Sequence, residues 1–220
     1  MAQHLRIDFI SDIACPWCVI GLRSLLKAID AVGDDVQAEI HLHPFELNPH
    51  MPTQGENAFE HVRAKYGSTP ERSAAARQVI AEHGAAVGFS FNYSPDSRIW
   101  NTFDAHRLLH WAELEGCALD LKQALFKATF TDQRPSNDAD ALVDAAREAG
   151  LNPERAREVL ASGAYADEVR AHEDFWRQRG INAVPSIIFN QRWLIQGGQP
   201  AQVFERAIRD IIAGVARAAS

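Results

Sequence analysis

The sequence predicts an α/β protein in which a small core of strands and helices is interrupted by a long helical segment. Strand-like apolar alternation occurs before about residue 50 and again after about residue 180. Between these limits, apolar residues recur at helical spacing and are separated by loop signals such as Gly, Pro and Asn. Two cysteines, two residues apart, directly follow the first strand-like run. The predicted order is strand, helix, strand, helical insertion, strand, strand, helix.

The first strand and the first helix flank the cysteine pair. In residues 5–11, the side chains of Leu5, Ile7 and Phe9 fall on one face at a period of two, as in a half-buried strand. Downstream, apolar residues recur at the spacing of one helix face as far as Gly33, which is a typical helix end. The cysteines therefore lie on the turn that enters a helix.

The tetrapeptide Cys15-Pro16-Trp17-Cys18 on this turn indicates redox chemistry. Unpaired N–H groups and the positive end of the helix dipole stabilise a thiolate at such a position. Pro16 suits a helix start because its fixed φ and missing N–H cost nothing there. We expect Cys15 to be the reactive thiol at the exposed start of the turn, and Cys18 to be shielded by the first helical turn.

Three other interpretations of the cysteine pair are a structural disulfide, half of a zinc site, and chance. A structural zinc site needs about four ligands, usually as two spaced pairs, and the remaining cysteine, Cys117, has no paired neighbour. We interpret Cys117 as a packing residue. A purely structural disulfide would close a very short loop and would constrain the unfolded chain little. These arguments favour a redox-active dithiol.

Length and composition narrow the class of protein. A chain of 220 residues with 46% hydrophobic content accommodates one large domain, or a domain with a substantial insertion. Its 22 basic and 29 acidic residues give a net charge of −7 without a long basic stripe, so we expect no nucleic-acid partner. The sequence starts without a secretory signal and no run reaches the roughly 20 apolar residues of a membrane span, so we expect no membrane partner and a cytoplasmic location. In that reducing compartment a dithiol is more often catalytic than structural.

The second strand is predicted over residues 36–42, where apolar and polar residues alternate. His41 and His43 share one face of this strand, and His106 and His110 stand four apart in a predicted helix. We interpret both pairs as packing or surface histidines, because no third ligand accompanies the first pair and no carboxylate lies between the second. We therefore expect no metal.

The helical insertion is predicted over residues 51–179. Its first helix follows Thr69, a suitable N-cap with proline next to it. The predicted helices cover residues 70–87, 101–113, 119–130, 138–149, 153–161 and 165–179. Residues 1–50 and 180–220 together form the predicted core domain.

The last part of the chain returns to strand character. Residues 186–189 and 193–195 flank the short segment 190–192, which predicts a β-hairpin. An amphipathic helix is predicted from Pro200 to about Ala216.

Several motifs resemble those of the thioredoxin superfamily. The cysteine tetrapeptide and the stretch Gly180–Ser186 before the final hairpin carry this resemblance, and the helical insertion narrows it to the DsbA-like branch. Within that branch the chain is most similar to the FrnE-type, 2-hydroxychromene-2-carboxylate isomerase/DsbA-like group. The motifs that support this are Pro44-Phe45-Glu46-Leu47-Asn48-Pro49, Asn101-Thr102 with Ala105-His106-Arg107, and Gly197-Gly198-Gln199-Pro200. The resemblance covers nearly the whole chain.

The resemblance implies a thioredoxin fold built from both ends of the chain, with the inserted helices as a lid beside the dithiol. Pro185 matches the cis-proline of the family. The bond before it is therefore expected to be cis, with the backbone of Val184 facing Cys15 and available to an extended substrate. Pro16 and Trp17 are likewise expected to contact the substrate.

The dithiol and the resemblance together imply a thiol–disulfide oxidoreductase in which Cys15 attacks a disulfide and Cys18 resolves the mixed disulfide. One alternative is a glutathione-dependent isomerase or transferase of the hydroxychromene isomerase or kappa-class type, where serine typically stands in place of Cys15. Another is a partner-binding module in a biosynthetic pathway. The expected partners are thiol or disulfide substrates, protein or small molecule, and a homodimer stays open. No resident cofactor is expected, and glutathione is considered only as a redox partner.

Overall fold

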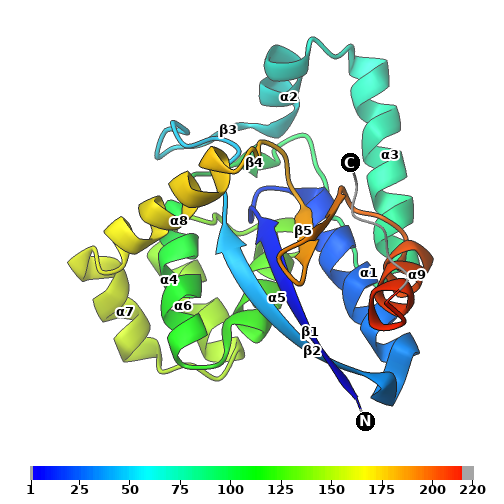
Figure 1. Ribbon diagram of the computed structural model, residues 1–220. Coiled ribbons are helices and arrows are strands. Elements are labelled where there is room, and N and C mark those ends of the chain that lie inside the picture. Colours follow the sequence, from blue (N-terminus) through cyan, green and yellow to red (C-terminus); the bar gives the residue numbers. More distant parts are fainter. Residues whose placement is uncertain (1, 215–220) are drawn as a thin grey trace.

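The computed structural model describes residues 2–214, which form a four-stranded sheet with helices on both of its sides (Figure 1). The spatial order of the strands is β2-β1-β5-β6, and β3 and β4 form a separate two-stranded sheet. The strands are β1 (Gln3–Ser11), β2 (Val36–Pro44), β3 (Glu56–Asn57), β4 (Arg98–Ile99), β5 (Ser186–Phe189) and β6 (Trp193–Gln196).

The helices divide into two groups by their place in the chain. Helix α1 (Pro16–Val32) joins β1 to β2, and α9 (Ala201–Ile212) follows β6. The others all come from the segment between β2 and β5. They are α2 (Ala58–Tyr66), α3 (Pro70–Ala86), α4 (Phe103–Leu114), α5 (Ala118–Phe130), α6 (Ala139–Glu148), α7 (Pro153–Ser162) and α8 (Ala166–Gln178).

Strand β1 lies inside the sheet, between β2 and β5. It pairs with β2 in parallel, which requires the α1 crossover, and with β5 in antiparallel orientation. In this register Ile7 lies opposite Phe189 and Ile10 lies opposite Ser186. The residues that precede β5 are therefore brought beside the residues that follow β1. These are the stretch around Pro185 and the cysteine turn.

The two groups of helices cover different parts of the sheet. Figure 1 shows α1 and α9 packed together to the right of the strands, and α4 and α8 to their left, where both contact the edge strand β2. One apolar cluster includes Phe9 of β1 and Leu22 of α1 together with Leu121 and Phe126 of α5. The inserted helices thus share a core with the sheet. The division into residues 1–50 with 180–220 and residues 51–179 stays a prediction about folding units.

Most elements agree with the sequence prediction, including the helix that ends at Gly33 and the helix capped by Thr69. Helix α2 was not predicted, because none of its residues is buried and no apolar face marks it. Its end signals were present: the Asn57 side chain accepts from the first turn, and Gly67 closes the helix in the left-handed region. The end predicted for the last helix, Ala216, lies outside the described residues. None of the described helices is long and apolar enough to cross a bilayer.

Candidate active site

Helix α1 begins at the cysteine pair. Cys15 is the N-cap residue, with extended backbone angles of φ −100° and ψ 110°, and Pro16 follows at the helix start. The Cys15 N–H donates to the carbonyl oxygen of Asp12 at 3.3 Å, and the Cys18 N–H donates to the carbonyl oxygen of Cys15 at 3.0 Å. Both thiols are free, so the structure represents the dithiol form.

Cys15 is less accessible than the sequence analysis predicts. Its exposed fraction is 4%, against 0% for Cys18, so the prediction of an exposed Cys15 is wrong and that of a shielded Cys18 is confirmed. The loop before β5 contributes to covering Cys15, whose Sγ lies 3.7 Å from the carbonyl oxygen of Val184. The Val184–Pro185 bond is cis, as predicted. The spacing of residues near Cys15 could not reveal this cover, because it comes from the far end of the chain.

The buried thiol of Cys18 resists ionisation. Burial raises its pKa well above the ordinary value, and the adjacent Cys15 raises it further through a hydrogen bond and its charge. The backbone of Asp12 and the positive charge of Lys122 act in the opposite direction. Ionisation of Cys18 is therefore favoured only by the Asp12 backbone and the Lys122 charge, against the effect of burial.

Lys122 is the buried cation near the dithiol. It lies on α5, is 1% exposed, and its Nζ is 5.1 Å from the centre of the Phe126 ring. Burial lowers its pKa to about 8, although the negative charges of Cys18, Asp12 and Cys15 oppose this. The ammonium makes no hydrogen bond or ion pair with any residue that the structure describes. Its charge thus interacts with those of Asp12 and the two cysteines, without a hydrogen-bonded partner among the described residues.

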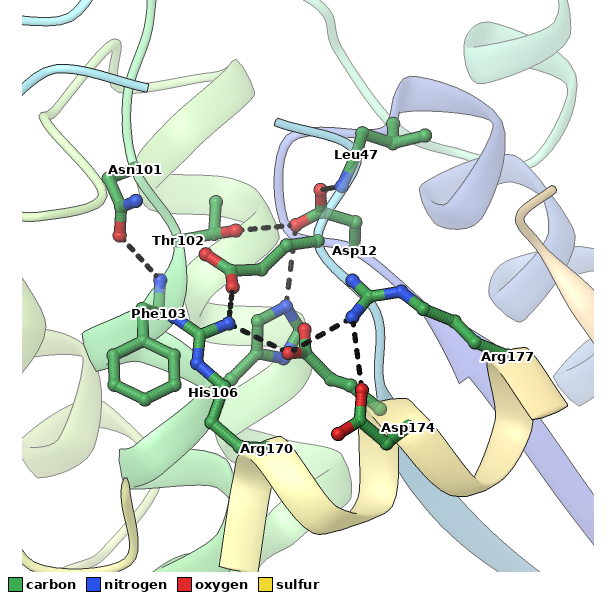
Figure 2. Close-up of polar contacts among 11 residues, drawn as sticks. Asp12, Leu47, Asn101, Thr102, Phe103, His106, Arg170, Asp174 and Arg177 are labelled. Atoms are coloured by element: carbon green, nitrogen blue, oxygen red, sulfur yellow. Dashed lines mark hydrogen bonds and ion pairs between the residues drawn. The ribbon is translucent and has the colours of Figure 1, made fainter. Parts of the chain in front are cut away.

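A buried carboxylate, Asp12, organises the other side of the turn (Figure 2). Its Oδ1 accepts from the Thr102 hydroxyl at 2.8 Å and from the Ala14 N–H at 3.2 Å, and it lies 3.4 Å from His106 Nε2. Its Oδ2 accepts from the Leu47 N–H at 2.7 Å. Burial alone would raise the pKa of Asp12, but His106 and these donors hold it below its ordinary value. Asp12 therefore stays ionised next to the cysteine turn.

A second buried acidic group fixes the insertion to the loop after β2. The carboxylates of Glu46 and Glu173 are both buried, and Arg170 bridges them by donating to an oxygen of each, at 2.8 Å for Glu173. Burial and the charge of Glu173 raise the pKa of Glu46. Figure 2 shows Arg170 and Arg177 reaching from one face of α8 into this network. Each glutamate still leaves one oxygen without a partner among the described residues.

Two glycines allow the cis-proline loop and the start of α1 to pack closely. A Cβ on Gly198 would lie 2.8 Å from the carbonyl oxygen of Trp17, and a Cβ on Gly21 would lie 3.1 Å from the Pro185 ring. In the Gly197-Gly198 motif, Gly198 therefore has a steric reason, and Gly197 has a positive φ of 84° that favours glycine. The Trp17 ring meets the His83 ring edge-on, with centroids 5.4 Å apart, so this predicted substrate contact lies between the core and α3.

The two histidine pairs seen in the sequence converge in space. His41, His43, His106 and His110 line a cavity of about 280 Å³ between β2 and α4. Within residues 2–214, no group of three or more His, Cys, Asp or Glu side chains is arranged to hold a metal ion.

Four residues near Cys15 and Cys18 were predicted from the sequence, and two were missed. Those predicted are Pro16, Trp17, Val184 and Pro185, and those missed are Asp12 and Lys122. A signal existed for Lys122, because it stands on the same helical face as Leu121 and Leu125, where an apolar residue is expected. For Asp12 the signal was indirect. The motif residues Leu47, Thr102 and His106 were recognised only by resemblance, and Figure 2 shows that all three converge on this carboxylate.

The mixed sheet with its helical insertion, the cis-proline loop and the two thiols at a helix start define a protein of the thioredoxin-fold class. The family model of the DSBA-like thioredoxin domain matches residues 6–209. The chain belongs to this family.

Three known proteins align with almost the whole chain. The crystal structure of a probable DsbA oxidoreductase from Streptomyces coelicolor is 35% identical, with a TM-score of 0.89 over 99% of this chain and 93% of that chain. An uncharacterized protein of Bacillus subtilis, YwbO, is 28% identical over 96% of this chain and 98% of its own length. A 2-hydroxychromene-2-carboxylate isomerase shares 13% identity and a TM-score of 0.70 over 96% of this chain and 100% of that chain, which is a likeness of fold alone.

Proposed function

We propose that the protein is a thiol–disulfide oxidoreductase with Cys15 as nucleophile and Cys18 as resolving thiol. The observation that carries the proposal is the pair of free thiols at the start of α1, with the first thiol facing the Val184–Pro185 loop. The oxidoreductase name of the 35% identical Streptomyces relative supports it.

The proposed reaction proceeds in two exchanges. The Cys15 thiolate attacks one sulfur of a substrate disulfide, forms a mixed disulfide and releases one substrate thiolate, which takes up a proton. The Cys18 thiolate then attacks the Cys15 sulfur, forms the protein disulfide and releases the second substrate thiol. Two electrons pass from the protein dithiol to the substrate. The reverse sequence oxidises a substrate dithiol.

The surroundings of Cys18 support its role in the second exchange. Its raised pKa means that it must lose a proton before it can attack. Lys122 favours the thiolate by its charge, and with a pKa of about 8 it can also hold or give up a proton near neutral pH. We propose that Lys122 supports ionisation of Cys18 when the mixed disulfide has formed.

We further propose where the protein acts and which molecule restores its dithiol. A cytoplasmic location and glutathione as the redox partner suit a dithiol that must be returned to its starting state after each cycle. The glutathione-dependent isomerase alternative needs a bound thiol but no second cysteine, and the Cys18 thiol adjacent to Cys15 favours exchange instead.

A trapping experiment tests the proposed exchange. In cell extract, Cys18→Ser is expected to accumulate mixed disulfides through Cys15, because the resolving step is removed, and Cys15→Ser is expected to accumulate none. Cys117→Ser is the matched control and should behave as the parent protein. Adducts that form equally with both active-site variants, or with neither, would refute the exchange mechanism.

A further inference from the structure

A cavity of about 340 Å³ lies directly beside the reactive cysteine. Its lining includes Ala14 and Pro16, the two chain neighbours of Cys15. The rest of the lining comes from the segment between β2 and β5, chiefly from α2, α3 and the residues around β4. The volume is in the range of small-molecule binding pockets.

The walls of this cavity are mainly aromatic. Five aromatic side chains line it, contributed by four separate elements or loops, and aliphatic side chains fill the spaces between them. The aromatic residues are Phe59, Tyr66, Tyr93, Trp100 and Phe130. Such a lining favours a flat apolar group, because aromatic rings gain most from stacked or edge-on contact with another ring.

Tyr93 and Arg77 are polar side chains of the lining that form no side-chain hydrogen bond with the described residues. The hydroxyl of Tyr93 makes no hydrogen bond with the described residues, and burial followed by the charge of Cys15 raises its pKa, so it stays a donor. The guanidinium of Arg77 lies 4.1 Å from the centre of the Phe59 ring and has neither a hydrogen bond nor an ion pair within residues 2–214. By contrast, Arg98, which also lines the cavity, donates to the carbonyl oxygens of Gln54 and Gly55. Arg77 is thus free to bind an anionic group.

The low exposure of Cys15 limits which disulfides can reach it. The exposed fraction of Cys15 is 4%, so only a small part of this residue is open to an approaching disulfide. A small molecule can instead place its ring in the cavity and its sulfur beside Pro16.

We propose that the cavity binds the ring of a small aromatic thiol or disulfide that carries a carboxylate, with the carboxylate at Arg77 and the sulfur near Tyr93 and Cys15. This inference rests on the proposed exchange function and names its substrate class. The reaction is the two-step exchange given above, in which one aryl disulfide becomes two aryl thiols and the protein dithiol becomes a disulfide.

The test compares three disulfides as oxidants of the reduced protein: dithiobis(nitrobenzoate), dithiodipyridine and hydroxyethyl disulfide. Each rate constant is divided by that of dithiothreitol with the same disulfide, which removes differences in intrinsic reactivity. Val62→Trp fills the cavity from α2, and Val79→Trp adds the same ring on the exposed side of α3 as its matched control. Val62→Trp is expected to slow both aromatic disulfides about tenfold and to leave hydroxyethyl disulfide unchanged.

A second pair of variants tests the anionic contact. Arg77→Gln should slow dithiobis(nitrobenzoate) about tenfold and leave dithiodipyridine unchanged, since a charge-assisted hydrogen bond is lost only with the former. Arg72→Gln removes the same charge from an exposed position of α3 outside the cavity lining and should change neither rate. Equal normalised rates in all four variants would overturn the substrate class while leaving the exchange function in place.

Direct binding separates the two proposals. Calorimetry of naphthoate with the Cys15→Ser variant should show saturable binding that weakens about tenfold when Arg77→Gln is added. If none of the three disulfides oxidises the protein yet naphthoate binds, the exchange function fails and the cavity assignment holds. If naphthoate does not bind, the cavity assignment fails.

Discussion

Replacing Lys122 by Met should make the protein more stable and its resolving step slower. Methionine has a similar length and fills the same space on α5, but it carries no charge. Lys122 is 1% exposed and its ammonium has no partner among the described residues, so the folded protein gains little from the charge itself. The charge does, however, lower the pKa of Cys18.

The stability effect follows from the pKa of the lysine. At about 1.4 kcal/mol per pH unit, a fall from the ordinary value of 10.5 to about 8 corresponds to a penalty of about 3 kcal/mol for the charged form. The penalty is complete below pH 8, where the lysine is charged in both folded and unfolded chains, and it disappears above pH 10.5. Lys122→Met should therefore raise the free energy of unfolding by up to about 3 kcal/mol at pH 7, and this gain should shrink as the pH rises from 8 to 10.5.

The kinetic effect follows from the pKa of Cys18. Loss of the Lys122 charge removes one of the groups that lower the pKa of Cys18, so the thiolate fraction and the rate of resolution should both fall at neutral pH. Urea denaturation of the reduced proteins at pH 7 and pH 10 measures the first effect, and stopped-flow release of the second substrate thiol measures the second. Lys127→Met on the same helix is the control, because Lys127 is solvent-exposed and pairs with Asp132. A Met variant that is less stable at pH 7, or that resolves the mixed disulfide at the parental rate, would refute the reasoning.

Three further changes test the groups around the dithiol. Asp12→Asn should lower the free energy of unfolding by about 2–3 kcal/mol at pH 7, because an amide cannot accept from all the groups that now donate to the Asp12 carboxylate. Folding lowers the pKa of Asp12, so the parent protein should lose this advantage over the variant as the pH falls below about 4. A difference in stability that does not depend on pH would contradict the prediction. Gly198→Ala should cost about 1–3 kcal/mol through contact with the Trp17 carbonyl, measured by thermal unfolding, and an unchanged midpoint would contradict it. Arg170→Met should destabilise the protein by about 1–3 kcal/mol at pH 8, because it leaves two buried carboxylates without their cation. The loss should become smaller as the pH is lowered and Glu46, whose pKa is raised, takes up a proton, and urea denaturation that gives the same loss from pH 8 down to pH 4 would be evidence against this.

Short sequence patterns predicted most helices and strands of the fold. They did not predict the burial of Cys15 or the ionisation of Asp12, because both depend on residues that are distant in the chain. Thr69 marks a helix start because capping acts within a few residues. The burial of Cys15 depends on Val184, which is 169 residues away in the chain. The ionisation of Asp12 depends on donors from two separate loops and from α4. No periodicity encodes such distances, and only the resemblance to a family pointed to these segments together.

The inserted helices differ in how deeply they are buried. None of the residues of α2 is buried, and α3 buries only Ser73 and Gly84, whereas α5 buries most of its inner face together with Lys122. Helix α5 is therefore tied both to the common core and to the charge balance of the dithiol. Helices α2 and α3 touch the cavity but barely enter the core. A chimera that exchanges only α2 and α3 for those of a relative is therefore expected to react with a different range of disulfides, while both thiol–disulfide exchange steps proceed as before.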